Sequence, residues 1–219
     1  SSRYRIQIKP SGVLGTNSEQ NSLLCHDVPI IAATSLFSNL LSTLIFAAQP
    51  IASTIPQKLV SSCRDQLNWR TTYDPTYTKL KFPNGDVPKK KGVCTDVLVR
   101  AFRSAGYDLQ SLIHKHKSAN VNQYSNRKID TNIDHRRVQD QMAFFKAKGK
   151  TLSNELQSPD WKPGDIVCWI LPSGRDHTGL LSDKRGPSGN LMVFHNMSIP
   201  KEEDCLGSFR IVAHFRYPK

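Results

Sequence analysis

The sequence predicts an α+β fold in which a helix packs on one face of a small antiparallel sheet. Up to about residue 149, apolar residues recur at helical spacing in several segments. After the Pro-Gly pair at residues 163–164 they gather in short β-branched or aromatic runs. Helices that precede the strands, instead of alternating with them, are typical of the α+β class. The length of 219 residues suits one well-packed domain with an appendage.

Residues 1–54 are expected to be the appendage and residues 55–219 the domain. Residues 1–22 are polar, rich in Ser, Gly and Asn, and lack a period that would bury a face, which indicates a tail. Residues 28–48 carry no charge and are followed by small residues, as in an export signal. Their Ser and Thr content makes a poor membrane span, so a buried or amphipathic helix is an equal alternative.

The first helix of the domain is predicted from Ile55, where apolar residues begin to recur at helical spacing and Pro56 suits a first turn. We expect it to run for about four turns. The next stretch, residues 73–92, contains three prolines, an Asn-Gly pair and five lysines. It is therefore expected to be a surface loop.

The segment GVCTDVLVRAFRSAG predicts a helix with one apolar stripe that packs on the core. Cys94 lies in its first turn, and Gly106 takes a C-cap position. Further helices are expected after Asp108 and after Asp134, whose side chain would cap the second of them. That helix ends in lysines and Gly149.

Four runs then predict strands: DIVCWIL, HTGLLS, NLMVFHN and SFRIVAHFRY. The turn sequences PSGRD and DKRGPSG and a longer acidic loop separate them. The runs therefore indicate an antiparallel sheet.

Composition restricts the classes of function. The hydrophobic share of 38% supports a folded, soluble core, and the net charge of +12 favours polyanionic surroundings such as nucleic acid, anionic lipid or wall polymers. The five cysteines include no Cys-x-x-Cys pair, so a structural zinc site is not expected. A basic nucleic-acid-binding module remains a rival because of the lysines at residues 89–91, although no aromatic residues are interleaved with the basic ones.

Cys94 has the position that a nucleophilic thiol needs. Unpaired amides and the dipole at a helix start lower the pKa of a thiol, and these amides can hold the oxyanion formed when a carbonyl is attacked. The polar neighbours Thr95 and Asp96 argue against an inert buried cysteine. Such a nucleophile needs a base that titrates near neutral pH. Among the seven histidines, His177 begins a predicted strand, and His195 near the end of the adjacent strand is placed to orient it.

Four segments, in order, resemble parts of the NlpC-type papain-like cysteine peptidases. GVCTDVLVRAF, WKPGDIVCWI, GRDHTGLLSD and MVFHN are similar to the nucleophile helix, the Pro-Gly-Asp strand, the histidine strand and the polar third position. Together with YDPTY, FPNGDVP and NIDHRRV, they look like a bacterial domain-of-unknown-function family assigned to that superfamily and generally predicted to be exported. The resemblance covers about residues 56–217 and implies a papain-like fold.

The resemblance implies that Cys94 is the nucleophile, His177 the general base and His195 the orienting residue. Asn196 competes for the last role. Successive residues of a strand face opposite sides, so only one of these two neighbours can face the helix start. The apolar pattern of NLMVFHN does not decide between them, and the resemblance favours His195.

Three further positions follow from the same resemblance. Tyr73 or Tyr77 would supply an oxyanion hydrogen bond or a wall for the substrate, with simple packing as the alternative. Many NlpC-type members have Asp immediately before the cysteine, whereas this chain has Val93 there and Asp96 two residues after. Asp96 is nevertheless one of the substrate-binding or oxyanion candidates, as is Asn196.

Other polar clusters have a structural alternative. Residues 134–137 hold arginine forks that match carboxylates, which makes Arg136 a substrate-binding candidate, but a helix cap and a solvated first turn fit equally well. Asp165 follows a Pro-Gly pair and is expected to fix a turn. His114 and His116 diverge on a helix, so a solvated face is expected there instead of a metal site.

The functional prediction is a cysteine hydrolase that cleaves amide bonds in the peptide part of bacterial peptidoglycan, without a metal or an organic cofactor. The substrate and a periplasmic or secreted location come from the resemblance, and binding to anionic wall polymers is compatible with the charge. No nucleic-acid partner and no stable transmembrane span are expected. The alternatives are an acyltransferase or thioesterase using the same Cys-His pair, or a non-catalytic basic module that binds nucleic acid or cell wall. The bond cleaved and the oligomeric state stay open.

Overall fold

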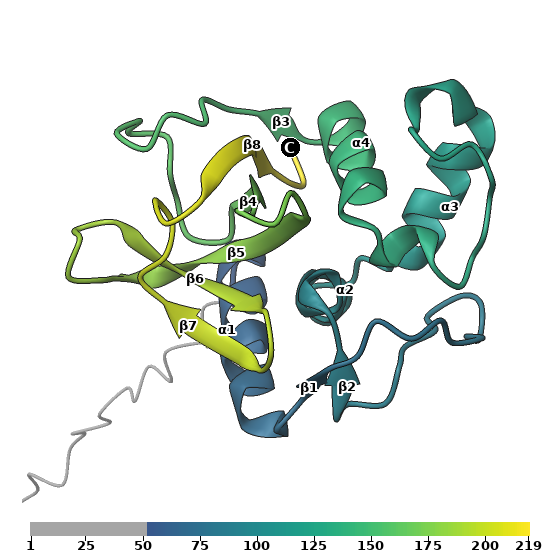
Figure 1. The fold of residues 1–219 in the computed structure, drawn as a ribbon, viewed down its shortest axis with the longest axis horizontal. Helices are drawn as coiled ribbons and strands as arrows, with labels where there is room; N and C mark the ends of the chain where they lie inside the picture. Colours follow the sequence, from purple (N-terminus) through teal and green to yellow (C-terminus); the bar gives the residue numbers. More distant parts are fainter. Residues whose placement is uncertain (1–51) are drawn as a thin grey trace, which may run out of the picture. The chain divides into compact units, whose positions relative to one another are not determined.

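The computed structural model describes residues 52–219 (Figure 1). The predicted tail at residues 1–22 and the apolar stretch at residues 28–48 lie outside the described residues. Within the part of the chain that is described, no helix combines the length and the apolar character needed to cross a membrane.

The described residues contain four α-helices: α1 (Ile55–Gln66), α2 (Cys94–Ser104), α3 (Leu109–Ala119) and α4 (Val138–Lys148). The first three begin where the sequence predicts. Thr54 caps α1 with Pro56 in its first turn, and Asp108 caps α3. Gly106 follows α2 with a φ of +92°, a left-handed conformation that glycine adopts without the steric penalty of a Cβ.

The prediction for α4 is wrong at its start. Residues 134–136 form a short 3₁₀ helix, and the α-helix begins at Val138. The Asp134 carboxylate does not cap α4, because it lies 2.9 Å from Nζ of Lys117 on α3. The predicted solvated face of α3 is also wrong. Lys117 is fully buried between the carboxylates of Asp134 and Asp140, and His116 is buried with its Nδ1 2.7 Å from the Tyr124 hydroxyl.

Six strands of the described residues form an antiparallel sheet in the order β3-β8-β4-β5-β6-β7. Their bounds are β3 (Lys150–Thr151), β4 (Ile166–Ile170), β5 (Asp176–Arg185), β6 (Leu191–Asn196), β7 (Pro200–Glu203) and β8 (Arg210–Arg216). The predicted runs are β4, β5, β6 and β8, which confirms the α+β class. Strand β7 lies in the predicted acidic loop, and the sequence patterns predict neither β7 nor β3. The lysine-rich loop is a loop as predicted, with its ends joined by the parallel pair β1 (Thr72–Tyr73) and β2 (Lys91–Gly92).

The two faces of the sheet pack against different partners. Leu180 and Phe194 face the helices in one core, and α1 and α2 lie against β5 and β6 (Figure 1). Trp169 and Leu181 belong to a second core on the opposite face, which loop residues such as Leu206 cover. Because side chains alternate along a strand, the residues at the adjoining ends of β5 and β6 are divided between these two faces.

Candidate active site

Cys94 is the first residue of α2 and is buried. The residue before it, Val93, has an extended backbone, and its N–H donates a 2.8 Å hydrogen bond to the Asp96 carboxylate in the first turn of the helix. Asp96 is therefore a cap for α2. The expected position of the thiol at the start of a helix is present.

The sulfur of Cys94 lies where β5 and β6 separate. Their pairing ends at Leu180 and Phe194, and the backbone N–H of Thr178, two residues nearer the start of β5, favours the thiolate form of the sulfur. His177 is the residue immediately before Thr178. The thiol thus sits against the backbone of the predicted histidine strand.

Burial raises the pKa of Cys94 to about 12 and outweighs the backbone N–H groups of Thr178, Thr95 and Cys94 itself, which act in the opposite direction. The prediction that the helix start gives this thiol a lowered pKa is therefore wrong. The amides do stabilise the thiolate, but the loss of hydration is larger. At neutral pH the resting group is therefore the thiol.

The two predicted histidines are in direct contact. Nε2 of His177 lies 3.1 Å from Nδ1 of His195, and the ring of His177 stacks on Trp169 with centroids 5.7 Å apart. Burial lowers the pKa of His177 to about 3, so its ring is neutral at pH 7. Asn196 faces the other way, and its Nδ2 donates to the Gly92 carbonyl at 3.3 Å. Asn196, and not His195, is therefore the neighbour that faces the start of α2, so the prediction that His195 faces it is wrong. His195 is the one of the two that contacts His177.

Sequence reasoning missed a third group in this chain of contacts. Oε2 of Glu203 on β7 lies 2.9 Å from Nε2 of His195. Glu203 stands in the acidic loop, and only the pairing of β6 with β7 brings it beside the imidazole. The acidic residues of that loop indicate that a carboxylate is available, but they do not indicate the strand register that places Glu203 beside His195.

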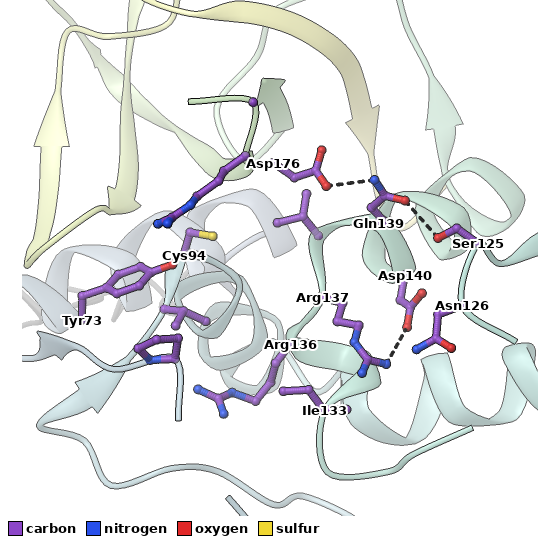
Figure 2. A pocket seen from close by; sticks show the side chains of 15 residues that line it. Tyr73, Cys94, Ser125, Asn126, Ile133, Arg136, Arg137, Gln139, Asp140 and Asp176 are labelled. Atoms are coloured by element: carbon purple, nitrogen blue, oxygen red, sulfur yellow. Dashed lines mark hydrogen bonds and ion pairs between the residues drawn. The ribbon is translucent and has the colours of Figure 1, made fainter. Parts of the chain in front are cut away.

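A cavity of about 530 Å³ lies beside Cys94 (Figure 2). Tyr73 lines it, and Figure 2 shows the hydroxyl end of this side chain directed toward Cys94. Tyr77 lies elsewhere, since its hydroxyl hydrogen-bonds to Asp130 at 3.0 Å. The structure thus brings one of the two candidate tyrosines to Cys94.

The arginines around this cavity differ in availability. Arg136 lines it, but both its Nε and its Nη2 are 2.9 Å from the carboxylate oxygens of Asp96, and both side chains are buried. Its guanidinium is therefore occupied by Asp96. Arg175, from the predicted PSGRD turn, also lines the cavity, is exposed, and forms no ion pair with the acidic groups of the described residues. Sequence reasoning did not select it.

Two further polar clusters include residues of the sheet. Asp165 accepts hydrogen bonds from His214 at 2.8 Å and from Arg216 at 2.7 Å, which agrees with its predicted structural role. Ligand atoms of His195, Glu203 and Cys205 lie within 4.8 Å of one another, so these three residues could hold a metal ion. Two of those atoms, on His195 and Glu203, already share a hydrogen bond.

Comparison with known proteins gives a family. The model described as "Domain of unknown function (DUF1287)" matches residues 60–217. A protein of Escherichia coli (strain K12), named "Uncharacterized protein YijF", is 39% identical to this chain over 164 residues, which are 73% of this chain and 80% of that protein.

Proposed function

This chain belongs to the DUF1287 family, and we propose that it is a cysteine hydrolase of the papain-like NlpC type that cleaves amide bonds in the peptide part of bacterial peptidoglycan. The observation that carries this proposal is the position of Cys94. Its thiol, at the first residue of α2, lies beside the backbone N–H of Thr178, the residue that follows His177, and the ring of His177 contacts His195. A nucleophile, a base and a group that orients the base are what a cysteine hydrolase requires.

The reaction proceeds by acyl transfer. The Cys94 sulfur attacks the amide carbonyl carbon while its proton passes to Nδ1 of His177, the ring nitrogen that His195 does not engage. The amides at the start of α2 and the Tyr73 hydroxyl hold the oxyanion. The C–N bond breaks as His177 returns the proton to the leaving amine. Water then gives a proton to His177 and attacks the thioester, which releases the acid and regenerates the thiol.

Because both groups are neutral at rest, proton transfer accompanies attack and does not precede it. The pKa of the thiol is raised and that of the imidazole is lowered, both by burial. A substrate that enters the cavity and brings its carbonyl to the sulfur starts the transfer.

Wall peptide is the substrate class that three observations favour. The motifs resemble those of NlpC-type wall peptidases. The net charge of +12 suits an anionic wall, and the exposed guanidinium of Arg175 beside the cavity suits the carboxylates of such peptides. A periplasmic or secreted location belongs to the same proposal.

The test is digestion of purified wall fragments, with the products resolved by mass spectrometry. Wild type and Cys63→Ala, which changes a buried thiol of α1, are expected to release new amino and carboxyl ends, whereas Cys94→Ala releases none. Undiminished cleavage by Cys94→Ala, or loss of activity with a chelator alone, would contradict the proposal. Turnover of thioesters or lipid esters in place of wall peptides would assign the same groups to a thioesterase or acyltransferase.

A further inference from the structure

We propose that Glu203 is a positioning residue that fixes which nitrogen of His177 carries the proton, an inference that rests on the proposed function. Glu203, His195 and His177 form an unbroken chain, with 2.9 Å between Oε2 and Nε2 and 3.1 Å between Nδ1 and Nε2. They come from the adjacent strands β7, β6 and β5.

This chain of hydrogen bonds determines the tautomers of both histidines, starting from Glu203 at its outer end. An ionised carboxylate only accepts hydrogen bonds, so Nε2 of His195 must donate to Glu203. A neutral imidazole carries one proton, which leaves Nδ1 of His195 as an acceptor. Nε2 of His177, facing that acceptor, must then donate. The remaining nitrogen, Nδ1 of His177, is therefore bare and able to take the thiol proton.

The surroundings of Glu203 and His195 hold these two residues in the protonation states that the tautomer argument requires. The Lys201 ammonium, 2.8 Å from Oε1 of Glu203, and the His195 ring keep the pKa of Glu203 below its usual range, so the carboxylate is ionised. Burial lowers the pKa of His195 against the opposing effect of Glu203, so its ring is neutral near pH 7. Both conditions of the tautomer argument are thus met.

Without Glu203, the direction of the hydrogen bond between His195 and His177 can reverse. His195 can then donate from Nδ1 to Nε2 of His177, which places the proton of His177 on its Nδ1. A base protonated at that nitrogen cannot accept the thiol proton. Glu203 thus acts on the reaction through His195, in the way that outer groups fix the tautomer of a catalytic or metal-bound histidine.

The experiment combines nitrogen-15 NMR of the imidazole rings at pH 7 with steady-state cleavage of wall peptide. Wild type is expected to carry the proton on Nε2 in both rings. Glu203→Ala, and Glu203→Met which keeps the bulk if the first variant does not fold, should move proton population to Nδ1 of His177. They should also lower kcat by about tenfold or more at similar KM, in line with the loss of an outer group that orients a histidine. Glu203→Gln retains an acceptor oxygen and should preserve the tautomer and most of kcat.

Lys201→Ala is the matched control, because it removes the outer ion pair but leaves on His195 a carboxylate that is ionised at pH 7 even at the ordinary pKa of glutamate. Unchanged imidazole spectra in Glu203→Ala and Glu203→Met would overturn the positioning role, whatever happens to activity. A shifted tautomer in a protein whose wild type cleaves no wall peptide would leave the role of Glu203 standing and remove the proposed function instead.

Discussion

The guanidinium of Arg136 holds the carboxylate of Asp96 through two hydrogen bonds of 2.9 Å, with both side chains buried. Asp96 also accepts the N–H of Val93 and so caps α2. The pair fastens residues 134–136 to the first turn of the helix that carries Cys94. Arg136 is thus a structural support for the helix that carries Cys94, and Arg175 is an exposed guanidinium beside the cavity that forms no ion pair within the described residues.

Replacing Arg136 by Met is expected to lower the free energy of unfolding by about 3–5 kcal/mol, because it leaves Asp96 buried without its countercharge. Arg137→Ala is the matched control, since the side chain of Arg137 is 38% exposed and a loss of about 1 kcal/mol or less is expected. Urea denaturation followed by circular dichroism measures both. Equal losses in the two variants would contradict the structural role.

Tyr73→Phe is expected to lower kcat by about tenfold or more without unfolding the protein, because it removes a hydroxyl aimed at Cys94 that can hold the oxyanion. Tyr77→Phe removes a hydroxyl of the same kind that bonds to Asp130 outside the cavity, so its kcat should stay near that of wild type. Steady-state kinetics on wall peptide compare the two. A larger loss in the Tyr77 variant would exclude Tyr73 from the oxyanion site.

Alkylation of Cys94 by iodoacetamide should accelerate about tenfold for each pH unit between pH 6 and pH 9. Burial raises the pKa of this thiol to about 12, so the reactive thiolate fraction grows throughout that range. Peptide mapping by mass spectrometry gives the rate at each cysteine, and Cys63, buried in α1, provides an unreactive reference in the same sample. A rate that is flat across this range would indicate a resting thiolate–imidazolium pair.

Binding to anionic wall material should depend on the lysine-rich loop, residues 79–91. All five lysines of the loop are exposed, and Lys79, Lys81 and Lys90 form no ion pair within the described residues. Changing these three to Gln should weaken sedimentation with insoluble wall at low salt and reduce its salt dependence. Wild-type binding that is constant across an ionic-strength series would exclude electrostatic attraction, and tighter sequence-selective binding to DNA would revive the nucleic-acid alternative.

Stability should fall as pH decreases from about 6.5 toward 4. Burial lowers the pKa of His135 to about 4 and of His177 to about 3, so the unfolded chain binds more protons than the folded one in this interval. Each such histidine contributes a slope of about 1.4 kcal/mol per pH unit. Urea midpoints for wild type and His135→Gln, measured from pH 7 to pH 4.5, test this, and the variant should show the shallower slope. Parallel curves would remove His135 as a contributor.

Local patterns in the sequence determined most of the secondary structure. The helical stripe after Gly92 and the left-handed position of Gly106 bound the helix that begins at Cys94, and the short apolar runs became strands β4, β5, β6 and β8. These features depend on residues within a few positions of one another, so periodicity and turn chemistry specify them. The α+β class and the position of the thiol at a helix start followed directly.

Tertiary structure alone decided which groups meet. The apolar pattern of β6 suits either face, and it is the register with β5 and β7 that sets His195 between His177 and Glu203 while Asn196 bonds to Gly92. The same holds for the pairing of Arg136 with Asp96 and for the burial that raises the pKa of Cys94. These contacts join segments distant in sequence, and the solvation of a group depends on everything packed around it, so no local pattern encodes them.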